Sequence, residues 1–443
     1  MKLLRALVLI ACCCVAGSAA DFSGNWHQWR GPLATGLGPN ATPPESWSEE
    51  KNVRWKSKLP GLGHATPIVW NDRVFVLSAV PFGPKRESVY TKVEGAHDNF
   101  PVTQKHRFII QALSRKDGKT VWQKTLWEGY PHEGGHYTGS LVSNSPITDG
   151  KKLYAFLGSR GLYALDLDGE IVWQKDLGQM ETRHAHGEGS SPALHGETLV
   201  INWDHQKQSY LLAFNTRIGK QLWNVKRNEM TSWSTPLIVE HESQPQVIVS
   251  ATGAVRGYNL KNGKVIWECK GLSRNVVATP VAAKGMVFAA NSYDWQAMLA
   301  IRLQGAKGDI TESTNVVWKL NRLTPYVPSP LLFDNTLFFL RHNQNILSVV
   351  DPATGENIDG PYRLGGIREV FASPVAADGR IYIVDRSGNT IVFGYENRKL
   401  NFRIVNHLDD KFSASPALAG KELYLRGEKH LYCLAESRAE IKN

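Results

Sequence analysis

Two glycine-rich segments concentrate the side chains that could carry out chemistry. The first runs from Pro131 to His136 and the second from Arg183 to Glu188, and together they contain four histidines. Imidazole is the commonest protein ligand for zinc, copper and iron, so the predicted metal ligands are His132, His136, His184 and His186. Neither segment has the fixed helical spacing of a His-Glu-x-x-His site, so hydrogen bonding of these histidines to backbone or solvent is the alternative.

Arginine and aromatic residues form a second group of candidates, in the same kind of polar connection between apolar segments. An arginine fork and an aromatic face both give directional contacts to an anionic ligand, a carbohydrate-like ligand or a peptide strand. The predicted ligand- or partner-binding residues are Arg160, Trp233, Arg274, Tyr326, Arg341 and Arg368. The basic residues are otherwise scattered through a chain of net charge +10, which indicates no nucleic-acid-binding motif.

A repeated dipeptide indicates the elements that must position these side chains. Eight copies of Ser-Pro or Thr-Pro form a regular series, beginning at Thr66, Ser145, Ser191, Thr235, Thr279, Ser329, Ser373 and Ser415. The prolines of the last seven copies are 42 to 50 residues apart, and the first interval is 79 residues because it carries an insertion, at about 79–106. A period of about 40 to 50 residues built from strands is the length of one four-stranded propeller blade.

Each repeat has the same internal order. Asp-Gly pairs such as 149–150 and 378–379 predict hairpin turns, and an outer strand ending in tryptophan follows, as at Trp122 and Trp223. The pattern predicts an all-β fold, an eight-bladed β-propeller over 52–435. The eighth copy ends near Leu434 with no outer strand, whereas 52–56 has an outer-strand sequence and no blade. The N-terminal strand is therefore expected to complete the last blade, which removes an exposed sheet edge.

The repeats also carry a family resemblance. The segments 112–122, 213–223 and 257–267 and the shorter 350–356 resemble the tryptophan-docking repeat of quinoprotein propellers, Ala-x-Asp-x-x-Thr-Gly-Lys-x-x-Trp. In such repeats the indole of one blade packs on the neighbouring blade. The N-terminal segment 26–32, followed by 52–56, resembles the exported PQQ-repeat (BamB-like) proteins of bacteria. The resemblance spans about 52–435 and implies a propeller, but a shared fold does not by itself imply a shared function.

The resemblance implies two functional branches. PQQ-dependent dehydrogenases bind a quinone and calcium and oxidise alcohols or sugars, and many carry an adjacent cysteine pair beside the quinone. Adjacent cysteines occur here only at 12–14, so the expected function is that of the other branch, a non-enzymatic binding or scaffold module at the bacterial cell envelope, like BamB and its relatives, without a cofactor. A dehydrogenase using PQQ with calcium is the alternative, and a carboxylate-based glycoside-active propeller ranks third. The candidate bases of a dehydrogenase are Glu133, Glu188, Asp204 and Asp294.

The N-terminus predicts export. Residues 1–20 have early positive charge, an apolar run and small residues before a cleavage site near Ala20, as a signal peptide does. An N-terminal arm (21–51) and a C-terminal tail (436–443) would flank the ring. The expected location is the periplasm or outside the cell, as a monomer whose partner is an envelope protein or a small polar or anionic ligand. A lipobox-like segment ending at Cys12 makes an outer-membrane lipoprotein the alternative, and lipidation there is the one expected route to the membrane.

Signal cleavage would also leave few cysteines. Only Cys269 and Cys433 would remain, in predicted blades four and eight. Because these blades lie on opposite sides of an eight-bladed ring, no disulfide is expected between them.

Overall fold

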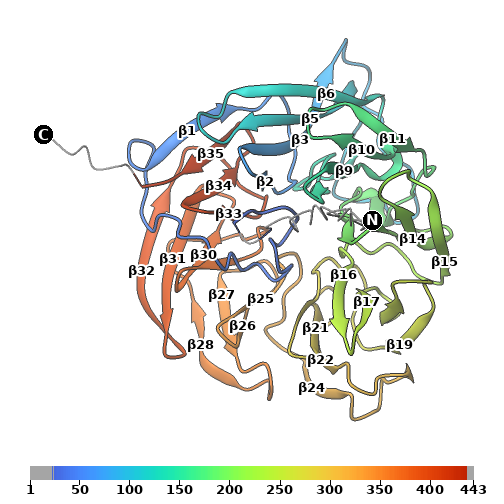
Figure 1. Ribbon diagram of the computed structural model, residues 1–443, viewed down its shortest axis with the longest axis vertical. Coiled ribbons are helices and arrows are strands. Elements are labelled where there is room, and N and C mark those ends of the chain that lie inside the picture. The colour runs from blue at the N-terminus through green and yellow to red at the C-terminus, as the bar shows by residue number, and fades with distance from the viewer. Residues whose placement is uncertain (1–21, 23, 437–443) are drawn as a thin grey trace, which may run out of the picture.

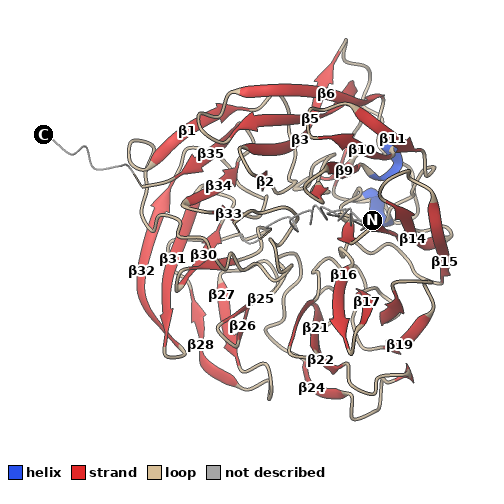
Figure 2. Cartoon of the chain, viewed as in Figure 1, coloured by secondary structure: helices blue, strands red, loops and turns tan. Residues whose placement is uncertain are grey.

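The described part of the chain, residues 22 and 24–436, forms a closed ring of eight blades (Figure 1). The computed structural model is all-β, and the helices among these residues are two single 3-10 turns, η1 (Gly158–Arg160) and η2 (Arg183–Ala185) (Figure 2). The predicted eight-bladed β-propeller is therefore confirmed. The predicted signal peptide (1–20), Cys12 and most of the predicted tail lie outside the described residues.

Each blade is an antiparallel sheet whose strands follow one another from the axis outward. Blade one contains β2 (Ile68–Trp70), β3 (Arg73–Phe82), β5 (Lys105–Ser114) and β6 (Thr120–Gly129), and blade two contains β8 (Ile147–Thr148), β9 (Lys152–Phe156), β10 (Leu162–Asp166) and β11 (Ile171–Lys175). Blade three contains β12 (Ala193–His195), β13 (Thr198–Trp203), β14 (Ser209–Asn215) and β15 (Gln221–Arg227), and blade four contains β16 (Leu237–His241), β17 (Gln244–Val249), β18 (Val255–Asn259) and β19 (Val265–Cys269). Blade five contains β20 (Val281–Ala283), β21 (Met286–Asn291), β22 (Ala297–Arg302) and β24 (Val316–Leu320). Blade six contains β25 (Leu331–Phe333), β26 (Thr336–Leu340), β27 (Ile346–Val350) and β28 (Asn357–Arg363), and blade seven contains β29 (Val375–Ala377), β30 (Arg380–Val384), β31 (Asn389–Glu396) and β32 (Lys399–His407). Blade eight consists of β33 (Ala417–Ala419), β34 (Glu422–Arg426), β35 (His430–Leu434) and the N-terminal β1 (Val53–Lys58).

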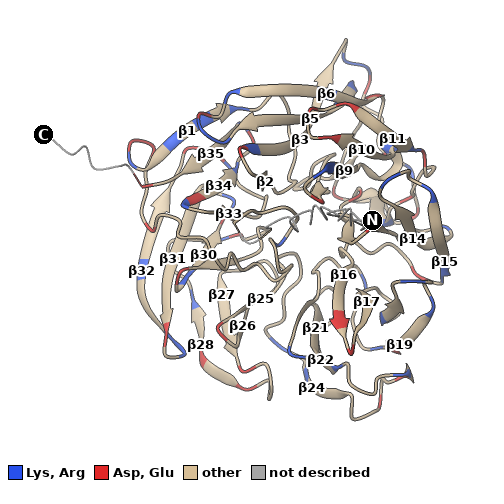
Figure 3. Ribbon diagram, viewed as in Figure 1, with Lys and Arg blue, Asp and Glu red and all other residues tan. Residues whose placement is uncertain are grey.

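The hydrophobic core lies between neighbouring blades. The middle strands are buried on both faces, as along the whole of β26 and β27, so their sequences are continuous apolar runs rather than alternating ones. Phe156 of blade two, for example, packs in one cluster with Leu199 of blade three. The outer strands alternate between exposed and covered positions, as β6 does. Figure 3 shows Lys and Arg interleaved with Asp and Glu around the circumference.

The Ser/Thr-Pro repeats form a hydrogen-bonded ring around the axis. The backbone N–H of each repeat's Ser or Thr donates to the side-chain hydroxyl of the next, from Thr66 to Ser145 and on to Ser415, over distances of 2.8–3.0 Å. The last step differs, because the Thr66 hydroxyl donates to the Ser415 carbonyl. Proline follows each of these residues and has no N–H, so it adds no donor that would need a partner near the axis.

Tryptophans link neighbouring blades. The indole N–H of Trp122, for example, donates to the Leu167 carbonyl of the next blade at 2.9 Å, and its ring covers Gly169. The same arrangement recurs from one blade to the next at Trp55, Trp173, Trp223 and Trp318. Trp267 departs from this pattern.

The departure at Trp267 has a local cause. Its indole is fully buried and donates to Gln246 within its own blade. A short strand of the following blade, β23 (Gly308–Asp309), pairs in parallel with β19 and becomes a fifth strand of blade four. This extra strand lies along the strand that carries Trp267, so the outer edge of blade four is built differently from its neighbours.

The N-terminal strand closes the ring, as predicted. β1 pairs antiparallel with β35, from Val53 opposite Leu434 to Lys58 opposite His430. Trp55 on this strand then donates to the Arg115 carbonyl of blade one. The closure thus joins the two ends of the described chain to each other and to the first blade.

The arm before β1 crosses one end of the central axis (Figure 1). Trp26 pairs with Val69 of blade one, and Leu37 pairs with Ala376 of blade seven. Between them Arg30 is 1% exposed and donates to the carbonyls of Pro330 and Pro374, at the inner strands of blades six and seven. The arm therefore blocks the axis on the face of the hairpin turns after the inner strands.

The insertion in blade one lies between β3 and β5. These two strands pair over ten residues each, which lengthens the blade. Beyond them the connection forms β4 (Asn99–Phe100), which pairs with β7 (Gly135–His136). The insertion is thereby fastened to the connection between blades one and two. None of the helices in the described ranges has the length and apolar composition needed to cross a bilayer.

Candidate functional site

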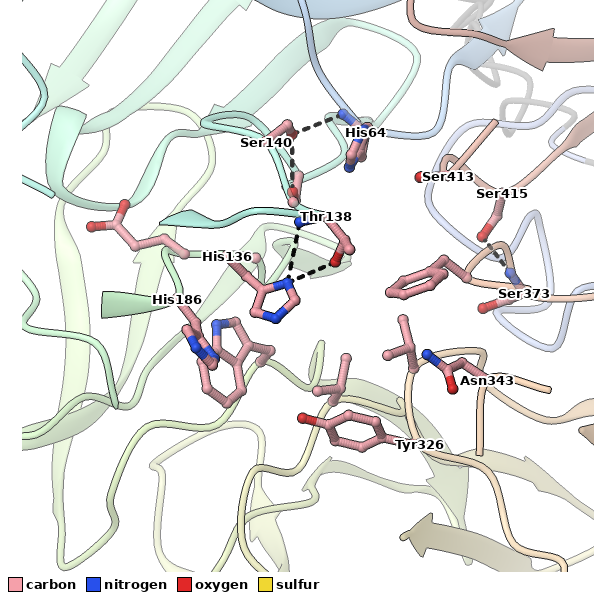
Figure 4. Close-up of a pocket in the computed structure, with 18 of the residues that line it drawn as sticks. His64, His136, Thr138, Ser140, His186, Tyr326, Asn343, Ser373, Ser413 and Ser415 are labelled. Atoms are coloured by element: carbon pink, nitrogen blue, oxygen red, sulfur yellow. Dashed lines mark hydrogen bonds between the residues drawn. The ribbon is translucent and has the colours of Figure 1, made fainter. Parts of the chain in front are cut away.

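A cavity of about 550 Å³ occupies the axis on the face opposite the arm (Figure 4). Its lining comes mainly from two kinds of connection, those between blades and those between the second and third strands of a blade. Blade-to-blade connections supply His136, Trp233 and Tyr326, and strand connections supply His342. Trp29 of the arm also lines it, so the cavity is open at one end and blocked by the arm at the other.

The insertion contributes one wall of this cavity. The β4–β7 pairing places His97 and Asp98 beside His136 and His186 at the mouth. The imidazole rings of His97, His136, His184 and His186 form a chain of contacts with centroids 4.4–5.3 Å apart. Two of the predicted histidines, His136 and His186, thus line the cavity, whereas His132 and His184 do not.

These histidines are not arranged as a metal-binding group. Within residues 22 and 24–436, no group of three or more His, Cys, Asp or Glu side chains is arranged to hold a metal ion. One ring nitrogen of each imidazole is hydrogen-bonded: His132 to the Met180 carbonyl, His136 to the Thr138 hydroxyl, His184 to the Gly95 carbonyl and His186 to the His97 carbonyl. Backbone and hydroxyl partners thus orient these rings, and metal binding by the four histidines stays a prediction.

Burial keeps four imidazoles of the cavity neutral. It lowers the pKa of His64 to about 3, with help from the nearby charges of Arg426 and Arg386. It lowers the pKa of His186 to about 4, with help from His136, and it also lowers the pKa of His136 and His342. At neutral pH the imidazoles of His64, His136, His186 and His342 are therefore uncharged.

The four predicted arginines lie outside the cavity lining, whereas Trp233 and Tyr326 belong to it. Arg160 is buried and donates to the Glu188 carboxylate at 2.7 Å. Arg274 makes a bidentate pair with Asp294, at 2.7 and 2.6 Å. Two of these guanidinium groups are thus already paired within the chain, and Arg341 and Arg368 lie outside the lining, so ligand or partner binding by the four arginines stays a prediction.

Each carboxylate proposed as a base for a dehydrogenase already has hydrogen-bond partners within the chain. Only Glu188 lines the cavity, and it is bound by Arg160 and the Ser159 backbone N–H. Glu133 accepts hydrogen bonds from Thr182, and burial raises its pKa to about 7. Asp204 is buried in a bidentate pair with Arg227, and Asp294 pairs with Arg274.

The lining does not fit PQQ with calcium. PQQ carries three carboxyl groups, and among the described residues no Lys or Arg lines the cavity to balance them. Calcium needs six to eight oxygen ligands including carboxylates, but of the three carboxylates at the cavity Glu188 and Glu369 are paired with Arg160 and Arg386. The two cysteines of the described residues, Cys269 and Cys433, are buried free thiols on β19 and β35, away from the lining.

Several lining residues were not identified from the sequence. His64, His97, Asn343 and Phe371 belong to ordinary connections, and Trp29 belongs to the arm. The position of His64 two residues before the first Thr-Pro could have indicated it, because that dipeptide marks the axis. His97 and Trp29 reach the cavity only through pairings that span distant parts of the chain.

Comparison with known proteins first identifies relatives by sequence. A family model described as outer membrane protein assembly factor BamB matches residues 106–360. An uncharacterised protein of Rickettsia prowazekii is 24% identical over 274 residues, which cover 56% of this chain and 57% of that protein, so the chain spans little more than half of this relative. Outer membrane protein assembly factor BamB of Moranella endobia is 23% identical over 324 residues, covering 68% of this chain and 74% of that protein.

Solved structures add a likeness of fold. BamB from Moraxella catarrhalis matches with a TM-score of 0.51 at 12% identity, covering 81% of this chain and all of that chain. A europium-containing methanol dehydrogenase matches with a TM-score of 0.59 at 10% identity, covering 92% and 90% of the two chains. At these identities the structures show the fold alone. Because the family model matches more than half of the 443 residues, the chain belongs to the BamB-like family of PQQ-type β-propellers.

Proposed function

We propose that the protein is an exported binding or scaffold module of the bacterial cell envelope that holds a protein or a small ligand at the mouth of its ring. The observation that carries this proposal is the axial cavity, open on one face and blocked by the arm on the other. Propellers with such a mouth present many side chains from separate blades to one ligand.

The family supports the envelope part of the proposal. The Moranella and Moraxella relatives are named as outer membrane assembly factors or BamB, and the N-terminus of this chain has the composition of an export signal. Envelope proteins are accordingly the proposed macromolecular partners. The lack of fit to PQQ with calcium favours this branch over a dehydrogenase.

Site-specific photo-crosslinking in the source bacterium tests the proposal. Tyr137 lines the cavity and is 66% exposed, so a photo-reactive amino acid there should give adducts with an envelope component. Ile218 is equally exposed, but it lies in the turn between β14 and β15 on the opposite face, and it is the matched control. The expected result is recovery of the protein in the envelope fraction with adducts from position 137 and none from 218.

Three results would overturn the proposal. The first is retention of the protein in the cytosol, and the second is an absence of adducts from position 137 together with an absence of any small ligand bound in the cavity. The third is reduction of an artificial electron acceptor by protein loaded with PQQ and calcium in the presence of an alcohol or a sugar. That third result would replace the scaffold proposal with the PQQ-dependent dehydrogenase.

A further inference from the structure

The axial cavity has the dimensions of a small-molecule site. Its volume of about 550 Å³ falls within the range of about 300–1,000 Å³ that ligand pockets occupy. The arm limits its depth, because Trp29 lines it and Arg30 ties the arm to the inner strands of blades six and seven. A ligand must therefore enter and leave from the face that carries the mouth.

The charge of the lining excludes strongly ionic ligands. In the described part of the chain no Lys or Arg lines the cavity, so a phosphate or carboxylate group would enter without a balancing cation. A cation is also disfavoured, because Glu188 and Glu369 are already paired with Arg160 and Arg386. The imidazoles of His64, His136, His186 and His342 are neutral, as shown above, and act as hydrogen-bond donors and acceptors without charge.

Aromatic faces surround the same space. Trp233 is held in place because its indole N–H donates to the Gly187 carbonyl at 2.6 Å. Across the cavity the ring of Tyr326 stacks on His342 with centroids 4.8 Å apart and contacts Tyr293 at 5.7 Å. Rings that are fixed by neighbours lose little freedom when a flat apolar face packs against them.

One buried polar atom of the lining has no protein partner. Among the described residues, the Nε2 atom of His64 is buried and has no hydrogen-bond partner, although the residue lines the cavity. A buried unpaired polar atom costs free energy until something satisfies it. In Figure 4 the ring of His136, the hydroxyl of Tyr326 and the amide of Asn343 lie around the same open space.

We propose that the axial cavity binds an uncharged saccharide of one or two rings. Its C–H faces would pack on Trp233 and the Tyr326 side, and its hydroxyls would bond to His64, His136 and Asn343. Such a ligand combines apolar faces with many neutral donors and acceptors, which is the combination that the lining offers. This inference rests on the proposed use of the ring mouth and names the chemical class of its ligand.

Isothermal titration calorimetry on the mature protein tests the inference. The probes are neutral sugars (glucose, galactose, mannose, N-acetylglucosamine, maltose and cellobiose) and the charged counterparts glucuronic acid and glucose 6-phosphate. At least one neutral sugar is expected to bind at least tenfold more tightly than either charged probe. If no neutral sugar of this panel binds, or if a charged probe binds as tightly, the inference is wrong.

A set of variants assigns the binding to the cavity. Trp233→Ala and Asn343→Ala should each weaken binding at least fivefold. Trp295→Ala should change it less than twofold, because Trp295 is an exposed indole outside the lining that also donates to a backbone carbonyl, that of Gly271. Equal losses from Trp233→Ala and Trp295→Ala would overturn the assignment. The side chain of Asn343 is not part of the hydrophobic core, so Asn343→Ala should leave the fold intact. A loss of sugar binding in this variant therefore reports on the cavity and not on folding.

The outcome is distinguishable from that of the crosslinking experiment. Sugar binding without protein adducts at position 137 would support the saccharide site and remove the protein partner. Adducts without sugar binding would leave the scaffold role and overturn the saccharide inference.

Discussion

Buried neutral histidines mark both ends of the central channel. His27 of the arm is 8% exposed, its Nδ1 atom has no hydrogen-bond partner among the described residues, and burial lowers its pKa to about 4. His64 at the cavity behaves in the same way. Desolvation disfavours the charged form, so each ring stays neutral where a free histidine would already be protonated. Protonation of these histidines at acid pH should therefore destabilise both the arm and the lining of the cavity.

This property predicts how stability depends on pH. As pH falls below about 6.5, the unfolded chain binds a proton at His27 before the folded protein does, so the free energy of unfolding decreases by about 1.4 kcal/mol per pH unit down to about pH 4. Glu133 acts in the opposite direction between about pH 7 and 4.5, because its pKa is raised in the fold. In His27→Gln the His27 contribution is lost while that of Glu133 remains. Urea unfolding at pH 7.5, 6 and 5 should show a flatter dependence in the variant, and parallel curves would contradict the prediction.

At the scale of the element, the Ser/Thr-Pro repeat fixes the spacing between the inner strands of neighbouring blades. Its hydroxyl accepts the N–H of the preceding blade, so the same side chain recurs in every blade and sets the distance between neighbours. Alanine in its place would leave a buried N–H unpaired. Threonine keeps the acceptor, and it already occupies this position at Thr66, Thr235 and Thr279.

Ser329 is a position where the ring can be tested away from the cavity. It is 2% exposed and accepts from the Thr279 N–H at 2.9 Å. Ser329→Ala should lower the free energy of unfolding by about 1–3 kcal/mol, the cost of an unsatisfied buried donor. Ser329→Thr should lower the free energy of unfolding by less than half of this amount, because threonine keeps the hydroxyl acceptor. Guanidinium unfolding measures both, and equal losses would show that the hydroxyl is not what matters.

The docking tryptophans predict which turn glycines are irreplaceable. A Cβ on Gly219 would lie 2.7 Å from the indole of Trp173, whereas a Cβ on Gly196 of the same blade would meet nothing within 4 Å. Both glycines have a positive φ, so alanine costs about 1–2 kcal/mol of backbone strain at either site. Gly219→Ala should cost about 1–3 kcal/mol more, because it also displaces the indole. Thermal melting of the two variants checks the difference, and equal melting temperatures would contradict the docking role.

At the scale of the whole molecule, closure depends on one strand. β1 is the outer strand of blade eight and also reaches blade one through Trp55. The insertion between β3 and β5, by contrast, is exposed over much of its length from Gly83 to Tyr90. A cut in the insertion leaves both sides of blade one in the ring, whereas loss of β1 leaves an unpaired sheet edge.

These two changes should have opposite consequences. A protease site engineered between Lys85 and Tyr90 should be cleaved readily, and the two fragments should elute together in size-exclusion chromatography with a melting temperature a few degrees below that of the parent. Deletion of 52–56 should cause aggregation or a large loss of melting temperature. A deletion variant that melts like the parent, or a nicked protein whose fragments separate, would contradict ring closure.

The repeated pattern determined the architecture of this protein. The number of blades, the order of the strands and closure of the ring by 52–56 were all predicted from two repeated features. These are the Ser/Thr-Pro dipeptides that begin at Thr66 and the outer-strand tryptophans such as Trp122. These features follow from local periodicity and from the need of every sheet edge for a partner. The exception at Trp267 was not foreseen, because it arises from a two-residue strand of the next blade.

The tertiary structure alone decided the site. Four of the predicted metal- or ligand-binding residues line the cavity, namely His136, His186, Trp233 and Tyr326. Arg160 and Arg274, by contrast, are paired with carboxylates 28 and 20 residues away in the chain. The cavity also takes Trp29 from the arm and His97 from the insertion. A residue type and its local spacing indicate that a side chain is polar and lies in a connection. Which charge faces it, and whether it reaches the axis, depend on contacts between segments that only the closed ring brings together.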